Sequence, residues 1–239
     1  MNQGTYPLAA SMINQFNRLD QISNNLANSN TNGFKQDGLT ETTFNQYLQR
    51  AQTEGFTPTK ISTVTNNIPK IDAKYIDSQV GPIATTGNKL DFALEQADTF
   101  FKLQNSNGDI VYTRDGAFKV LDGFLVDSNG NNILNNDNAP IEVNDNVRAE
   151  IGVTQIPFSN LEKIGNNNFK LKDENELAVF DNNDGLIIEG AIEKSNVNSV
   201  TAMVELIDAH RRFDQSQKAI KTIDELNATL IEKIGSNTN

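Results

Sequence analysis

The chain of 239 residues contains no cysteine and no tryptophan, and its only histidine is His210. The lack of cysteine excludes disulfide frameworks, thiolate metal sites and a cysteine nucleophile, and it suits an oxidising compartment. One histidine cannot complete a zinc site or a catalytic triad, so a packing or solvated role is expected for it. Phosphate-binding, dinucleotide-binding and nucleophile-elbow glycine motifs are also missing. The sequence therefore indicates no catalytic, cofactor-binding or metal site.

Long apolar runs and basic charge are scarce as well. No apolar stretch approaches the roughly 18 residues that a membrane span needs, and Met1–Gly4 lacks the basic start of a cleaved signal peptide. The 31 Asp and Glu exceed the 20 Lys and Arg, giving a net charge of -11, which argues against a nucleic-acid or anionic-membrane surface. A hydrophobic fraction of 37% indicates a chain that is rich in loops or relies on neighbours for burial.

What the chain does have is an apolar stripe of helical spacing near each end. Between residues 8 and 28 apolar residues recur every three or four positions, and the run stops at a polar stretch in which Gly33 can take a positive φ. The predicted helices, 8–28 and 196–234, would span about 30 Å and nearly 60 Å, which is too long for a modest β domain to cover. The predicted assembly interface consists of Leu8, Met12, Phe16, Leu19, Ile22, Leu26, Val197, Val200, Met203, Leu206, Ile207, Phe213, Ile220, Ile223, Leu230 and Ile234.

The middle of the chain shows short strand-like runs with regular turn signals. Asn-Gly or Asp-Gly pairs at 107–108, 115–116, 122–123 and 129–130 favour type I′ hairpin turns and predict a β-meander. Its strands are expected at 100–104, 110–113, 118–121 and 124–127, with further strands at 141–143, 150–157, 168–171, 177–180 and 186–192. The polar loops at 127–131 and 181–185 lack the spacing of a calcium loop and are expected to be turns.

The predicted fold class is α+β, with N- and C-terminal helices forming a coiled-coil-like pair around a central, mostly antiparallel β domain. The expected parts are an N-terminal helix and signature (1–35), an extended connector in which only 39–52 is helical (36–79), the β domain (80–194) and a C-terminal helix (195–239). Two interpretations of the terminal helices stay open. In the first, the helices pack onto the β domain of the same molecule. In the second, many copies cover one another's apolar stripes, and the helices become ordered on assembly.

Several segments resemble the signatures of the bacterial flagellar rod and hook axial proteins. The N-terminal one is Asn24, Asn25, Leu26, Ala27 and Asn28, followed by Thr31, Gly33, Phe34 and Lys35; the C-terminal one begins at Ser195, Asn196 and Val197. In the middle, residues 81–91, the run 112–118 and residues 161–167 agree as well. Where relatives have a Gly-x-Gly-Phe-Phe turn, this chain reads Gln96–Phe101 without glycine.

The resemblance implies a non-enzymatic, structural subunit of the flagellar basal-body rod that transmits torque and contains no cofactor. It further implies that terminal helices form the core of a tubular shaft, and that subunits pass unfolded through the flagellar type III export apparatus and assemble in the periplasm. The expected partners are other copies and other rod or hook axial subunits, without nucleic acid and without membrane insertion. Because no Gln-rich, Gly-rich insertion follows Lys35, the proximal-rod type is expected, with the distal rod second.

Specific roles and rivals remain open from the sequence. Asn24, Asn25, Asn28 and Thr31 are expected to cap or link backbone where the helix ends, although Asn25 and Asn28 fit equally well as simple helix-ending residues. One rival function is a soluble coiled-coil adaptor or adhesin with a small fixed number of subunits. The other is an enzyme that uses a carboxylate pair, although the sequence indicates no particular pair.

Overall fold

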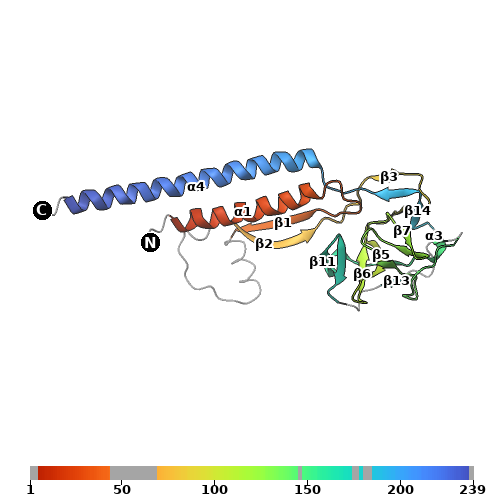
Figure 1. The fold of residues 1–239 in the computed structure, drawn as a ribbon. Helices are drawn as coiled ribbons and strands as arrows, with labels where there is room; N and C mark the ends of the chain where they lie inside the picture. The colour runs from red at the N-terminus through yellow and green to blue at the C-terminus, as the bar shows by residue number, and fades with distance from the viewer. Residues whose placement is uncertain (1–4, 44–68, 145–146, 174–177, 180–184, 237–239) are drawn as a thin grey trace. The chain divides into compact units, whose positions relative to one another are not determined.

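A computed structural model describes residues 5–43, 69–144, 147–173, 178–179 and 185–236 (Figure 1). The chain divides into two compact units. Unit 1 consists of Met1–Leu26, Asp37–Tyr75 and Ser199–Asn239, and unit 2 consists of Ala27–Gln36 and Ile76–Asn198. The two ends of the chain therefore belong to the same unit.

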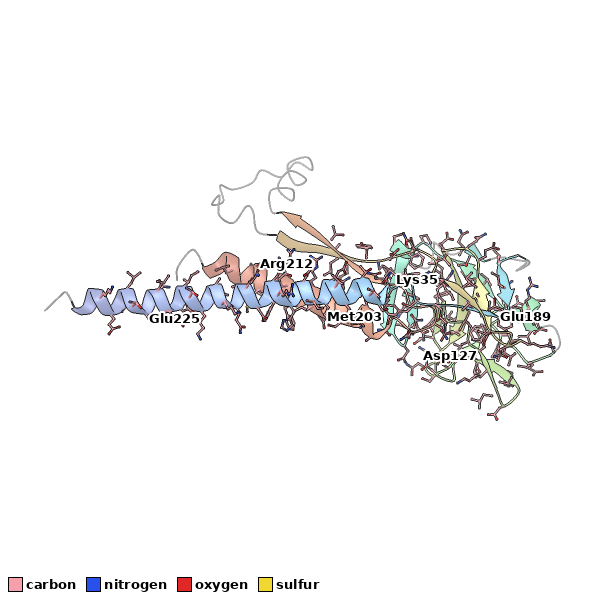
Figure 2. The ribbon with its side chains drawn as sticks, turned by 90° about the horizontal axis from the view of Figure 1, so that it is seen from above. Lys35, Asp127, Glu189, Met203, Arg212 and Glu225 are labelled. Atoms are coloured by element: carbon pink, nitrogen blue, oxygen red, sulfur yellow. The ribbon has the colours of Figure 1, made fainter. Side chains whose placement is uncertain are left out.

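Unit 1 contains two long helices, α1 (Thr5–Ala27) and α4 (Ser199–Ser236). They lie side by side and run in opposite directions (Figures 1 and 2). Both predicted helices are thus confirmed, as is the α+β fold class with terminal helices flanking a β region.

The less exposed faces of the two helices follow a heptad pattern. Steps of four and three residues alternate along both stripes, which is the 3.5-residue period of a coiled-coil seam. The stripe on α1 consists of Leu8, Met12, Gln15, Leu19, Ile22 and Leu26, and that on α4 of Ala202, Leu206, Ala209, Phe213, Ser216, Ile220, Ile223 and Asn227, all buried or half-buried. We call these positions the heptad stripes.

Two strands complete the described part of unit 1. β1 (Asp37–Thr43) and β2 (Pro69–Ile76) form a two-stranded sheet. The predicted helix at 39–52 is therefore wrong for residues 39–43, where β-branched threonines favour a strand. Residues 44–52 lie outside the described part of the chain.

Unit 2 is built around a nine-stranded antiparallel sheet. The order is β11-β12-β6-β5-β9-β8-β7, with β10 pairing with β5 and β13. Its strands are β5 (Thr99–Gln104), β6 (Ile110–Thr113), β7 (Lys119–Leu121), β8 (Phe124–Val126), β9 (Asn132–Ile133), β10 (Val153–Gln155), β11 (Leu161–Gly165), β12 (Asn168–Leu171) and β13 (Ala178–Val179). Two short turns of helix, α3 (Val147–Glu150) and η2 (Phe158–Asn160), flank β10.

β5 is buried on both faces. Successive side chains of a strand point to opposite sides, so those of β5 enter two different hydrophobic clusters. Phe101 and Leu103 belong to the larger hydrophobic core of unit 2, with Phe92, Phe118 and Ile133. Phe100 belongs to a second cluster, with Tyr112, Ile156, Leu161 and Phe169. The rings of Phe100 and Phe169 meet edge to face, 5.5 Å apart between centroids.

The predicted continuous meander is wrong. β6 pairs with β5 and β12 and not with β7, so residues 114–118 cross to another part of the sheet. Position 116 requires glycine, because the Cβ atom of any other residue would lie 1.7 Å from the carbonyl oxygen of Phe92. A type I′ turn is confirmed at Asp122 and Gly123, which have φ values of 51° and 86° and join β7 to β8.

The last predicted strand, 186–192, is interrupted by Gly190, which has a φ of 75°. β14 (Ile187–Glu189) before it pairs with β4 (Phe92–Leu94), and β15 (Ala191–Glu193) after it pairs with β3 (Ile83–Thr85). The predicted strand 168–171 is confirmed as β12, whereas β10 is shorter than the predicted strand 150–157. Of the predicted strand 177–180, residues 178–179 form β13, and residues 177 and 180 lie outside the described part of the chain. Residues 141–143 make only a single bridge, between Glu142 and Phe124.

Candidate assembly surface

Large apolar side chains remain exposed on α1, beside its heptad stripe. Ile13 and Phe16 are 60% and 61% exposed. The sequence placed Phe16 on the stripe, but the structure corrects this, because Gln15 occupies the heptad position and turns Phe16 to the neighbouring face. Within the described part of the chain, Phe16 is left largely uncovered.

A second exposed apolar face lies at the start of α4. Val200, Met203, Val204 and Ile207 are 52% to 71% exposed and follow one another at i, i+3, i+4 and i+7, so they share one side of the helix. Met203 is labelled in Figure 2. Further along the helix Leu226, Leu230 and Ile231 are also more than half exposed. We call Ile13, Phe16, Val200, Met203, Val204 and Ile207 the uncovered helix faces.

The predicted interface residues are thus divided into two sets. Leu8, Met12, Leu19, Ile22, Leu26, Leu206, Phe213, Ile220 and Ile223 lie on the heptad stripes inside unit 1. Phe16, Val200, Met203, Ile207 and Leu230 are exposed. Val197 is buried in unit 2, and the side chain of Ile234 lies outside the described part of the chain.

Asn25 links the end of α1 to β1. Its side-chain amide donates to the carbonyl of Asp37 at 2.9 Å, and its Oδ1 accepts the Asp37 N–H at 3.0 Å. The side chain of Gln21 also donates to the Asp37 carbonyl. Asn25 is 2% exposed, so it is a linking residue and not merely the end of a helix.

The other signature residues form the turn that follows α1. The Thr31 N–H and hydroxyl both bond to Asn28, at 3.1 Å and 3.2 Å, whereas Asn24 is exposed. Gly33 has the expected positive φ, 66°, and a Cβ atom there would lie 2.4 Å from the backbone of Arg114. Glycine is therefore required for both conformation and close packing.

Three buried charged residues join these motifs inside unit 2. Lys35 Nζ lies 2.7 Å from Glu193 Oε1, and Arg114 Nη2 lies 2.6 Å from Glu193 Oε2. All three side chains are no more than 1% exposed. Burial lowers the pKa of the Lys35 ammonium, and the Glu193 carboxylate partly opposes this shift. We call Lys35, Arg114 and Glu193 the charge cluster.

Arg114 also fixes the turn that lacks the family glycines. Its guanidinium donates to the carbonyls of Leu94, Gln96 and Thr99 at 3.2, 2.5 and 2.7 Å. None of residues 95–98 has a positive φ, in agreement with the absence of glycine there.

Asn196 fastens the C-terminal signature to two other segments. Its Oδ1 accepts the Gln36 N–H at 2.7 Å, and its Nδ2 donates to the carbonyls of Asp77 and Gln79 at 3.3 and 3.2 Å. One side chain thus holds the C-terminal signature to the segments around residues 36 and 77–79, each more than 100 residues earlier in the chain.

Sequence reasoning missed the charge cluster as a unit. Lys35 and Arg114 lie within motifs that carried the family resemblance, but nothing marked Glu193 as their shared partner. The available signal was a carboxylate at the end of an apolar strand, two residues before Ser195. A charged residue that is buried in such a place needs a partner.

The described residues contain no group of three or more His, Asp or Glu arranged to hold a metal ion. The His210 side chain is 68% exposed and lies 3.3 Å from Asp214 on the same helix. Among the helices that the structure describes, none is long and apolar enough for a membrane span.

Comparisons with known proteins place the chain in a family. The pattern described as "Flagella basal body rod protein" matches residues 9–35, "Flagellar hook protein FlgE/F/G D1 domain" matches 96–156, and "Flagellar basal body rod FlgEFG protein C-terminal" matches 188–233. The flagellar basal-body rod protein FlgG of Agrobacterium fabrum is 30% identical over 256 residues, covering 94% of this chain and 96% of that protein. The chain belongs to the flagellar basal-body rod family. It is a structural protein and not an enzyme.

Other relatives in the rod family cover nearly the whole chain. The basal-body rod protein FlgF of Rhizobium meliloti is 29% identical over 98% of this chain and 99% of its own length. The hook-basal body complex protein FlhO of Bacillus subtilis is 27% identical over 98% of this chain and 99% of its own length. The first and last matched patterns contain most of α1 and most of α4, and the middle pattern contains β5 to β10. Both helices and part of the main sheet therefore lie in segments that match the family.

Proposed function

We propose that this chain is a polymerising subunit of the flagellar rod, that it packs through α1 and α4 against other copies and other rod or hook axial subunits, and that the polymer transmits torque. The uncovered helix faces carry the proposal. These faces expose large apolar side chains beside the heptad stripes, whose own residues are already buried or half-buried.

The energetics favour burial of these faces in an assembly. Complete burial of one fully exposed, large apolar side chain contributes about 1.5–3 kcal/mol. The six side chains of the uncovered helix faces are 52% to 71% exposed, so covering each of them contributes roughly half of that value or slightly more. Close-packed side chains resist torsion, because helices cannot slide past one another without opening voids. A shaft built from such helices would therefore turn as one body.

We further propose that the subunit is of the proximal-rod type. The support is the absence of a Gln-rich, Gly-rich insertion after Lys35, where the chain continues directly into β1. The distal rod is the second candidate, since relatives named FlgG match about as well as those named FlgF. Tracing this chain in a density map of the intact basal body would distinguish the two positions.

The proposed location is the periplasmic part of the basal body, reached through the flagellar type III export apparatus without a cleaved signal peptide. This rests on the family alone. Cell fractionation should find the full-length chain, with Met1-derived N-terminal sequence, outside the cytoplasm only in cells with a working export apparatus. A shortened periplasmic form would contradict it.

The test of assembly is a charge on an uncovered helix face. Phe16→Asp should leave unit 2 folded and prevent incorporation into the rod, because a carboxylate cannot be buried against apolar neighbours. The matched control is Asn17→Asp, which places the same group on the adjacent, exposed position. Incorporation is measured by immunoblot of purified basal bodies, together with swimming.

The outcome separates the proposal from its rival. Normal basal bodies and normal swimming with Phe16→Asp would show that this face is not an assembly surface. A small oligomer of fixed size, formed by the wild-type protein and unaffected by rod partners in sedimentation, would instead support a soluble coiled-coil adaptor.

A further inference from the structure

The charge cluster is not part of the helix faces that the proposed assembly uses, yet its members are the most deeply buried charged side chains that the structure describes in unit 2. Two cations, Lys35 and Arg114, share one carboxylate, Glu193. Glu193 Oε1 also accepts the Gly81 N–H at 2.8 Å, and Lys35 Nζ donates to the Gln79 carbonyl at 2.7 Å. Asp77 and Asp98 are the other carboxylates that act on these cations.

The backbone around the cluster joins the two ends of the chain directly. The Gly33 N–H donates to the Glu193 carbonyl at 2.8 Å, and the Asn196 N–H donates to the Phe34 carbonyl at 3.3 Å. The Lys194 N–H donates to the Pro82 carbonyl at 2.9 Å. Segments 33–36, 79–82 and 193–196 therefore meet at one place in unit 2, and the first and last of them lead to α1 and α4.

Glu193 is the carboxylate that pairs with both buried cations of the charge cluster. Removing one partner of a buried ion pair is strongly destabilising, because the remaining charge stays buried without compensation. Without Glu193, both Lys35 and Arg114 would stay buried without the carboxylate that compensates their charges. Segment 33–36 can therefore settle in unit 2 with Lys35 buried only when segment 193–196 is in place.

We propose that Glu193, acting through Lys35 and Arg114, couples the docking of the N-terminal segment 33–36 to the docking of the C-terminal segment 193–196, so that both helices become available for assembly together. Glu193 is a positioning residue in this role. The link to assembly rests on the proposed function, whereas the coupling itself is a property of the single chain. Such coupling is reciprocal, because it is a shared free energy between two sites.

Hydrogen exchange of the full-length chain tests the coupling at both ends. The Phe34 N–H bonds to Thr31 within the N-terminal segment, the Lys194 N–H bonds to Pro82, and the Leu134 N–H bonds to Lys102 in the main sheet. Glu193→Gln should accelerate exchange at Phe34, and Lys35→Ala should accelerate exchange at Lys194, each by at least about tenfold. Exchange at Leu134 should not change.

Glu189→Gln is the matched control, because it removes the same charge from an exposed position on β14 (Figure 2). It should change none of the three amides. If each substitution accelerated only its own end, or if Leu134 were accelerated as much as the ends, the coupling would be refuted. The Lys35→Ala measurement decides the matter even where Glu193→Gln does not fold.

Rod incorporation then tests the consequence for assembly. Glu193→Gln should enter purified basal bodies several-fold less than Glu189→Gln. If Phe16→Asp is excluded from the rod but Glu193→Gln enters normally, the inference fails and the proposed function stands. If Phe16→Asp enters normally, the proposed function fails, whatever the exchange data show.

Discussion

Asp115 is a partly buried carboxylate with a raised pKa. It lies directly after Arg114, and its Oδ1 accepts the Ala117 N–H at 3.1 Å. Burial raises its pKa to about 6, and the nearby carboxylates of Asp127 and Asp91 add to the shift. The folded protein therefore holds this proton at pH values where the unfolded chain has already lost it.

The sign of the pH effect follows from this raised pKa. Between about pH 4 and pH 6 the folded state binds more protons at Asp115 than the unfolded state, so this residue makes folding less favourable as pH rises. At pH 7, Asp115→Asn should raise the free energy of unfolding by about 1–2 kcal/mol, after allowance for partial solvation. The difference from wild type should shrink below pH 6 and vanish near pH 4.

Denaturant unfolding of the two proteins across this pH range measures the effect. Asp122→Asn is a suitable control, because Asp122 is exposed at the β7–β8 turn, where asparagine is equally acceptable. If the difference in free energy of unfolding between Asp115→Asn and wild type did not depend on pH, the raised pKa of Asp115 would be contradicted.

At the scale of the elements, the heptad stripe of α1 has one polar interruption. Gln15 lies among Met12, Leu19 and other apolar residues, and its buried Oε1 finds no hydrogen-bond donor among the described residues. An unpaired buried acceptor costs about 1–3 kcal/mol. A single polar residue in a helix seam can fix the register of pairing at a cost in stability.

Gln15→Leu should therefore stabilise the helix pair of the isolated protein by about 1 kcal/mol. Thermal unfolding followed by circular dichroism at a helix-sensitive wavelength is the measurement. Gln217→Leu makes the same change at an exposed position of α4 and should have little effect. A lower melting temperature for Gln15→Leu would show that the Gln15 amide makes a favourable contact.

At the scale of the whole molecule, charge is divided unequally between the units. Of the 20 Lys and Arg and 31 Asp and Glu, unit 2 contains 10 and 20, a net charge of -10, and unit 1 contains the remaining 10 and 11, a net charge of -1. The helices that we propose to pack together thus belong to a nearly neutral unit, whereas the acidic β-rich units of neighbouring copies would repel one another in such an assembly.

Salt should consequently favour assembly. Raising sodium chloride from about 0.05 M to about 0.5 M shortens the screening length from more than 10 Å to about 4 Å and weakens this repulsion. The protein concentration at which purified subunits polymerise, followed by light scattering, should fall. The combined Glu95→Gln and Glu189→Gln variant, changed at two exposed positions of unit 2, should polymerise at lower salt than wild type. Polymerisation that weakened with salt would point instead to ion pairs between copies.

The sequence determined the two terminal helices, the β-rich middle and the Asp122–Gly123 turn, because each depends on local periodicity or on backbone conformation. It also determined that Gly33 takes a positive φ. These features need only neighbouring residues, so they can be inferred without knowledge of what lies beside them.

Only the tertiary structure decided which residues meet. A shift of one position separates Gln15 on the stripe from the exposed Phe16, and helical spacing of three or four residues accommodates either. The meander failed because strand order depends on long-range pairing, which turn signals do not encode. The partnership of Glu193 with Lys35 and Arg114, 158 and 79 residues away, exists because folding brings three distant segments into one buried place, where charges must find partners.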